Sequence, residues 1–139
     1  MRRNRLLLYV HLVWTTWDRL PLITPDIERQ LYRVIEHEAR DLGCIVIALN
    51  GTDDHVHLLV AMRATLSVAE LIKQVKGTSS RFVNDALQPK TQFKWQANYG
   101  ALTVSRWDID RIVAYIKRQK DHHANGETVP ELEQTHEER

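Results

Sequence analysis

Cysteine, net charge and long apolar runs are all scarce in this chain of 139 residues. The single cysteine, Cys44, excludes an intramolecular disulfide framework and is typical of a protein in a reducing cytosol. The formal net charge is only +1, so a surface that attracts nucleic acid must be a local one. No segment approaches the roughly 18 apolar residues of a membrane span, and the N-terminal apolar run lacks a signal-peptide cleavage site. We therefore expect a cytoplasmic protein with no membrane partner.

The composition is that of an ordinary globular protein. Apolar residues make up 43% of the chain and charged residues 27%, and the length suits one domain with its own core. The chain has no internal repeat, low-complexity tract or linker, and the segment from Asn125 is polar and acidic. We expect one domain over residues 1–124 and a polar tail over residues 125–139.

Apolar periodicity and capping signals predict the element order β-α-β-β-α-β-α. The first helix opens with Thr24 as N-cap and Pro25 at its first position, and Ser67 begins the second with a capping-box motif. The dipeptide Asn50-Gly51 is a turn signal between two strands. The expected strands span residues 5–17, 44–49, 55–62 and part of 93–105, and the expected helices span residues 24–43, 67–88 and 106–123.

The first six elements are those of a ferredoxin-like split βαβ fold. This α+β fold is a four-stranded antiparallel sheet with two helices on one face, and its first and third strands are central neighbours. The third helix is an addition that carries Tyr115. Because it has an apolar stripe of its own, we expect it to pack on the open face of the sheet; the stripe is Ile109, Ile112, Val113 and Ile116.

The stretch DDHVHLLV places two imidazoles in a strand that is otherwise apolar. Because side chains alternate along a strand, His55 and His57 share one face, while Val56, Leu58 and Val60 share the other. The apolar set should face the packed helices, which leaves the histidines on the open, solvent-facing side. Two imidazoles so placed can hold one metal ion. A pair of surface histidines, or of core histidines with satisfied hydrogen bonds, would have the same spacing.

Tyr115 and Gln119 lie four residues apart on one flank of the third helix, and His122 continues that flank. If this helix packs on the open face, a phenol and an amide approach the histidine pair. Simpler interpretations also fit the periodicity, because such a tyrosine can be an edge residue of the interface and such a glutamine can be solvated. Docking of the helix decides between these interpretations.

Four motifs together carry a resemblance to a known family: HVHLLV, LIKQVKGTSSRFVN, FKWQANYGALTVS and VAYIKRQKDHH. Over residues 6–123 the chain resembles the HUH-type single-tyrosine transposases of small bacterial insertion sequences and their repeat-associated relatives. The H-x-H motif alone is unspecific, but its combination with Y-x-x-x-Q-x-x-H-H is specific. The resemblance implies one catalytic domain in which Tyr115 is the nucleophile and His55, His57 and Gln119 bind a divalent metal, Mg²⁺ or Mn²⁺.

The reaction implied by the resemblance is DNA transposition by cleavage and rejoining of a single strand. A phenol with its ordinary pKa near 10 needs a metal or a base to attack phosphate at neutral pH. A divalent ion held by neutral ligands keeps its double charge and can stabilise the leaving 3′ oxygen. The resemblance supplies the remaining details: a 5′-phosphotyrosine intermediate, hairpin-bearing DNA ends, and a homodimer in which Tyr115 of one subunit completes the histidine site of the other.

Basic residues near these motifs are candidate contacts to DNA. Lys73 and Lys76 lie on one arc of the second helix, and Lys117 and His122 flank the tyrosine. Such clusters are also typical of solvated faces, but beside a phosphate site they become candidates for backbone contacts.

Four further residues carry weaker signals. Trp95 and Tyr99 can stack unpaired bases or pack in the core. Asp54 can orient a ligand histidine or simply end the turn. His11 lies on the neighbouring central strand, where a direct role is the less favoured interpretation.

Two other function classes fit the same elements. The sheet resembles that of RNA-recognition modules, which bind single-stranded nucleic acid without chemistry; those modules stack bases on strand aromatics, where this chain has histidines. A domesticated relative that binds or cuts DNA hairpins, but moves no element, would share every site residue with an active transposase.

Overall fold

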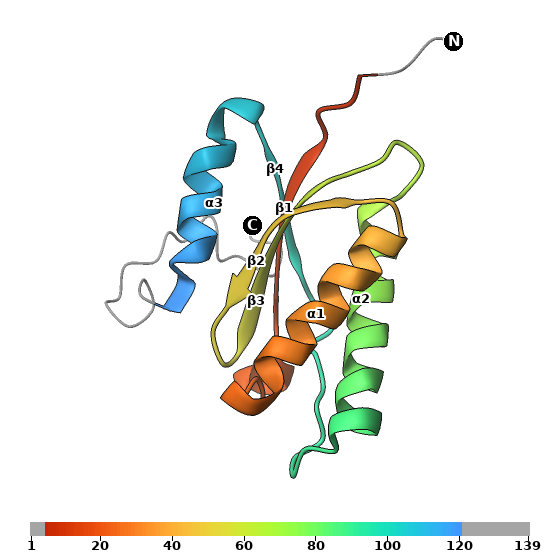
Figure 1. Cartoon of the computed structure of the whole chain (residues 1–139), viewed down its shortest axis with the longest axis vertical. Coiled ribbons are helices and arrows are strands. Elements are labelled where there is room, and N and C mark those ends of the chain that lie inside the picture. The colour runs from red at the N-terminus through yellow and green to blue at the C-terminus, as the bar shows by residue number, and fades with distance from the viewer. Residues whose placement is uncertain (1–4, 121–139) are drawn as a thin grey trace.

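The computed structural model describes residues 5–120, and its elements follow the predicted order. One antiparallel sheet has the strand order β2-β3-β1-β4, so the first and third strands are central neighbours as predicted. Figure 1 shows α1 and α2 on one face of the sheet and α3 on the other, which confirms the α+β fold expected from the sequence. The strands are β1 (Tyr9–Thr15), β2 (Ile45–Gly51), β3 (His55–Ala61) and β4 (Gly100–Val104), and the α-helices are α1 (Pro25–Asp41), α2 (Val68–Phe82) and α3 (Ile109–Lys117).

The larger hydrophobic core lies between the sheet and helices α1 and α2. Alternation along β3 sends three fully buried side chains into this core, as predicted: Val56, Leu58 and Val60. The neighbouring strand β1 adds Leu12 and Trp14, which are also fully buried. The helices contribute apolar stripes to this core, among them Ile27, Leu31 and Ile35 of α1 and Leu71, Ile72 and Val75 of α2.

Local capping signals place the first two helices. Thr24 stands at the N-cap of α1 with Pro25 directly after it. The hydroxyl of Ser67 accepts the backbone N–H of Glu70 at 3.0 Å, so the predicted cap of α2 is confirmed. Gly77 does not interrupt α2, which continues into a π-helical turn, Val83–Leu87, and ends at Gln88 with φ 46°.

The turn predicted at Asn50-Gly51 is wrong, because both residues belong to β2 and the chain reverses over residues 52–54. Gly51 has a different use there: a Cβ atom at this position would lie 2.1 Å from the backbone oxygen of His55. The glycine therefore permits a close approach of the two strands next to the loop that carries Thr52 and Asp54.

Helix α3 packs on the open face of the sheet, as predicted. Ile112 and Ile116 form a small apolar cluster there with Ala48 of β2 and Leu59 of β3. The predicted helix over residues 106–123 begins with a 3-10 turn, Arg106–Asp108, and its α-helical part is interrupted at Arg118. Gln119 and Lys120 are again helical.

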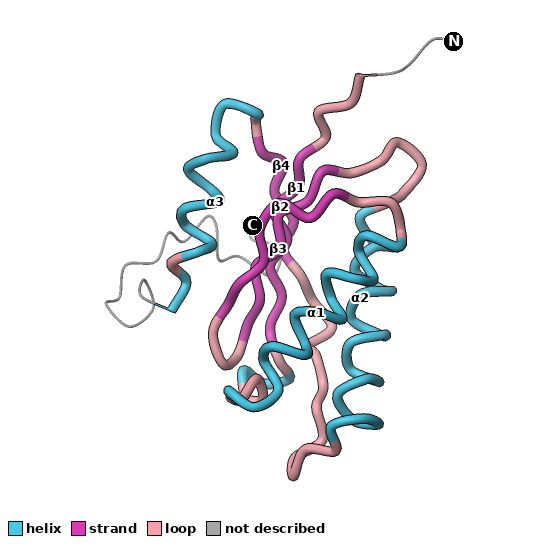
Figure 2. Tube along the Cα trace, in the orientation of Figure 1, coloured by secondary structure: helices cyan, strands magenta, loops and turns pink. Residues whose placement is uncertain are grey.

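The first strand is shorter than predicted, because β1 ends at Thr15 and the chain then enters a 3-10 turn at Trp17–Arg19. The fourth strand, β4, lies within the predicted segment 93–105 and begins at Gly100. Figure 2 shows the long loop that leads from α2 to β4. The domain boundary predicted at residue 124, the predicted tail and His122 lie outside the described residues. Among residues 5–120 no helix is long and apolar enough to span a membrane.

Candidate active site

The two histidines of β3 lie side by side beneath α3. Their ring centroids are 5.2 Å apart. The expectation that they face solvent is wrong, because His55 is only 3% exposed and His57 is fully buried. Alternation predicts the correct face of the sheet, but the covering helix removes that face from water. The pair is therefore placed where charge on a nearby group is poorly screened by solvent.

His55 is held by the short loop that precedes it. Its Nδ1 atom lies 2.8 Å from a carboxylate oxygen of Asp54 and 2.9 Å from the hydroxyl of Thr52. The hydrogen bond with His55 is the main cause that holds the pKa of Asp54 below its ordinary value. Because a carboxylate only accepts, we assign a hydrogen to Nδ1. Nε2 then faces α3, where it lies 3.3 Å from the amide oxygen of Gln119.

His57 contacts a third histidine, from β1. Its Nδ1 atom lies 2.8 Å from Nε2 of His11, and both side chains are buried. On its other side the ring of His57 meets the ring of Tyr115, with centroids 5.9 Å apart and planes at 74°. His57 is thus at the centre of the group, between His11 of β1 and Tyr115 of α3.

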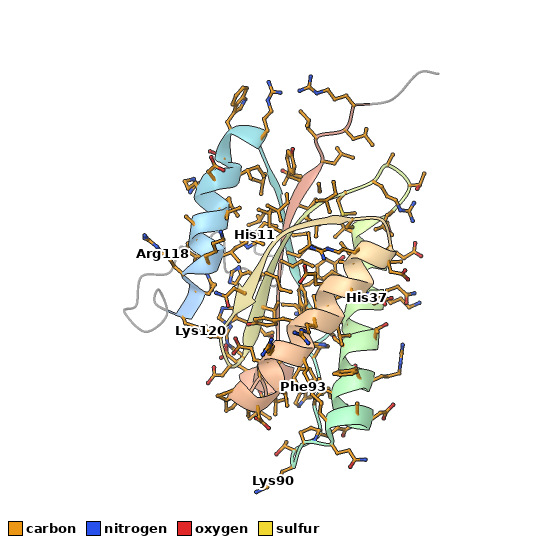
Figure 3. All side chains as sticks on the ribbon, in the orientation of Figure 1. His11, His37, Lys90, Phe93, Arg118 and Lys120 are labelled. Carbon is orange, nitrogen blue, oxygen red and sulfur yellow. The ribbon has the colours of Figure 1, made fainter. Side chains whose placement is uncertain are left out.

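Helix α3 supplies Tyr115 and Gln119 to this group, as the periodicity predicted. Tyr115 is 7% exposed and Gln119 is fully buried. The amide nitrogen of Gln119 donates to the backbone oxygen of Tyr115 at 3.4 Å, so one turn of chain links the two residues across the interruption at Arg118. Figure 3 shows Arg118 itself pointing away from the sheet. The phenol and the amide therefore reach the histidines from one short segment.

The C-terminal end of α3 is fastened to the end of β2. The side-chain nitrogen of Asn50 donates to the backbone oxygen of Lys117 at 3.1 Å. The ammonium group of Lys120 donates to the side-chain oxygen of Asn50 at 3.0 Å and to the backbone oxygen of Gly51 at 3.1 Å, and it pairs with Glu28 of α1 at 2.8 Å. Sequence reasoning missed this contact, because only the turn signal at Asn50-Gly51 drew attention to these residues.

The donor set suits a divalent metal ion. His55 and Gln119 already present an imidazole nitrogen and an amide oxygen to each other, with His57 adjacent. Within residues 5–120 no group of three His, Cys, Asp or Glu side chains has metal-holding geometry, and the third donor beside the two histidines of β3 is the amide oxygen of Gln119. A set of two histidines and one amide leaves coordination positions for phosphate oxygens and water.

The candidate DNA contacts differ in their surroundings. Lys73 and Lys117 are exposed. Lys76 is half-buried, which lowers its pKa, and its ammonium group donates to the backbone oxygens of the loop at residues 96–98. Trp95 is packed in the core and donates its indole N–H to Ser79 at 3.0 Å, and Tyr99 packs against that core.

Comparison with known proteins gives one consistent result. The family of IS200-like transposases matches residues 4–119. The ISDra2 transposase TnpA of Deinococcus radiodurans is 29% identical over 117 residues, which cover 80% of this chain and 83% of that protein. The crystal structure of a candidate transposase from D. radiodurans R1 superimposes with a TM-score of 0.67 at 27% identity, over 86% of this chain and 98% of that one.

A REP-associated tyrosine transposase bound to a REP hairpin superimposes with a TM-score of 0.64, over 92% of this chain and 75% of that one. Because the two chains are only 14% identical, this similarity supports the fold alone. The family match, by contrast, spans most of the chain and includes every described residue of the candidate site except Lys120. The chain belongs to the IS200-like family of transposases, enzymes of DNA recombination.

Proposed function

We propose that this transposase is of the HUH type and cuts and rejoins single-stranded DNA through a covalent bond between Tyr115 and a 5′ phosphate, with the help of a divalent metal ion. The observation that carries the proposal is the convergence of Tyr115, Gln119, His55 and His57 at one buried place. Among the described residues, the opposite face of the sheet packs against α1 and α2 mainly through apolar side chains.

In the first step the phenol oxygen of Tyr115 attacks the scissile phosphorus. The bond to the 3′ oxygen breaks, the 3′ oxygen leaves with the electron pair and takes up a proton, and the phosphate remains on the tyrosine. Because the new bond is also a phosphodiester, its energy is retained. A second 3′-OH can attack the phosphotyrosine, which rejoins a strand and releases the phenol without ATP.

Three side chains would hold the metal: His55 and His57 through their Nε2 atoms and Gln119 through its amide oxygen. When bound, the ion polarises the scissile phosphate and stabilises negative charge on the leaving 3′ oxygen. We propose Mg²⁺ or Mn²⁺, since both suit oxygen-rich phosphate chemistry, and Mn²⁺ also accepts imidazole. Asp54 and Thr52 support this role by fixing the ring of His55.

The proposed substrate is single-stranded DNA with a hairpin. A protein of this fold is bound to a REP hairpin, and exposed Lys73 and Lys117 offer cations for a DNA backbone. His122, which continues the tyrosine flank, remains a further candidate contact. A binding module without chemistry is less well supported, because the central strands carry buried histidines where such a module exposes aromatics.

The active form is proposed to be a homodimer whose sites are completed in trans. In the single chain, α3 packs on its own sheet, and its short apolar stripe could cover the equivalent face of a second copy equally well. Co-expression of Tyr115→Phe with His57→Ala tests this, because a mixed dimer then contains one intact site. Activity should reappear in verified heterodimers; heterodimers that stay inactive would show that each subunit completes its own site.

The proposed function is tested by incubating the full chain with labelled DNA in the presence and absence of Mg²⁺. Hairpin-bearing single strands should be cut and rejoined only with the metal, and the matching duplex should remain intact. Cutting without rejoining would identify a hairpin nuclease instead of a strand transferase. Binding without any cutting would contradict the proposed chemistry.

A further inference from the structure

His11 is a buried polar residue that the proposed reaction does not use. Its Nε2 atom lies 2.8 Å from Nδ1 of His57, and the ring centroids are 5.0 Å apart with planes at 29°. His11 is 1% exposed and lies on the side of the sheet that α3 covers (Figure 3). The sheet register pairs His11 with Leu59 and His57 with Val13, so the contact is diagonal between neighbours on one face.

Hydrogen placement in this pair is linked to metal binding. Of the two facing nitrogens, one must carry a hydrogen and the other must accept it when both rings are neutral. If His57 binds a metal through Nε2, its hydrogen is on Nδ1, and Nε2 of His11 is the acceptor. The reverse arrangement places the hydrogen of His57 on Nε2 and blocks that atom as a ligand.

His55 provides an internal comparison, because its Nδ1 atom faces the carboxylate of Asp54 and the hydroxyl of Thr52. The equivalent nitrogen of His57 faces the imidazole of His11. Each of the two proposed ligands thus has its own acceptor, supplied by the preceding loop in one case and by the adjacent strand in the other.

We propose that His11 is a positioning residue that selects the metal-binding tautomer of His57 and fixes the orientation of its ring. This inference rests on the proposed metal site. His11 acts through His57 and is not a ligand itself, in agreement with the absence of a metal-holding group of three His, Cys, Asp or Glu side chains among the described residues. A purely structural residue at this position could be apolar, as its counterparts on the other face of β1 are.

The test measures Mn²⁺ binding to the purified full chain by calorimetry without DNA. His11→Phe keeps a ring but removes the acceptor, and we expect it to weaken Mn²⁺ binding about 10- to 100-fold. His11→Gln returns an acceptor oxygen near the position of Nε2 and should recover most of that loss. Val13→Ala is the matched control, because Val13 is buried directly opposite His57 and has no polar group; it should lower the melting temperature and leave Mn²⁺ affinity unchanged.

His57→Ala separates this inference from the metal site on which it depends. If His57→Ala binds Mn²⁺ as the unmodified chain does, the metal site itself is wrong and the role of His11 falls with it. If His57→Ala loses binding while His11→Phe behaves like Val13→Ala, the metal site stands and the positioning role is overturned. The unmodified chain gives a readout that needs no variant: ¹⁵N NMR should show the hydrogen of His57 on Nδ1, and a hydrogen on Nε2 would contradict the proposal.

Discussion

The two faces of the sheet come from the same strands but differ in chemistry. Toward α1 and α2, β3 presents Val56, Leu58 and Val60, and toward α3 it presents two histidines followed by an apolar residue. Both sets are buried: His55 is 3% exposed and His57 not at all. Burial alone therefore does not distinguish the core from the site. The distinguishing feature is the cluster of three histidines, a tyrosine and a glutamine that is buried on the α3 face.

Buried polar groups are costly unless they have partners, and both histidines of β3 have them. His55 contacts Asp54 and Gln119, and His57 contacts His11. The apolar cluster on this face is small, and its buried members are Ala48, Leu59, Ile112 and Ile116. The α1–α2 face accordingly supplies most of the stability, and the α3 face maintains a polar group at some cost to stability.

The largest contrast is expected between two adjacent residues of β3. Leu58→Ala creates a cavity in the main core and should lower the free energy of unfolding by about 2–5 kcal/mol, while the protein that remains folded still cuts DNA. His57→Ala should abolish cutting, and because its side chain is fully buried it should also lose on the order of 2 kcal/mol of stability. Denaturant unfolding and a cleavage assay on the same preparations measure both effects. Cutting by the His57 variant would remove this residue from the site.

A smaller effect is expected at Gln119, which lies on the α3 side of the group. Gln119→Ala removes one amide oxygen that water can partly replace, so cleavage should continue but require more Mg²⁺ than the unmodified chain does. Metal titration of the cleavage rate measures this shift. A metal requirement identical to that of the unmodified chain would show that Gln119 only packs between His55 and α3.

The smallest effects are expected on α2, where Lys73 and Lys76 are compared. Lys73 is exposed, so Lys73→Ala should weaken binding to all DNA sequences alike and reduce the salt dependence by about one unit of slope. Lys76→Met should mainly lower the melting temperature, because Lys76 holds the loop at residues 96–98. If both variants show the same salt dependence of DNA binding, the two lysines do not differ as phosphate contacts. Either both of them contact phosphate or neither does.

Local patterns predicted the fold and brought together four members of the group, namely His55, His57, Tyr115 and Gln119. Alternation in β3 assigned His55 and His57 to one face, and helical spacing joined Tyr115 to Gln119, because both rules depend only on neighbouring residues. Solvent exposure of the histidines was predicted wrongly, since exposure depends on where α3 packs. The contact of His11 with His57 also depends on register between strands far apart in the sequence.

The hairpin between β2 and β3 also shows that local sequence signals do not determine contacts with distant parts of the chain. Asn50-Gly51 has the residue types of a tight turn, but Gly51 is required for the close approach to His55 and Asn50 for the contact with Lys117. A local signal identified two important residues and assigned them the wrong use. Whether Tyr115, His55, His57 and Gln119 act together in catalysis stays a prediction.

We propose that the polar group on the α3 face performs chemistry on DNA with Tyr115 as nucleophile. The most direct measurement is a search for protein covalently attached to labelled single-stranded DNA after incubation with Mg²⁺, followed by mass spectrometry of the attachment site. A DNA phosphate on Tyr115 is the predicted result, and Tyr115→Phe should bind the same DNA without forming the adduct. An adduct of undiminished yield in Tyr115→Phe, or one mapped to another residue, would contradict the claim.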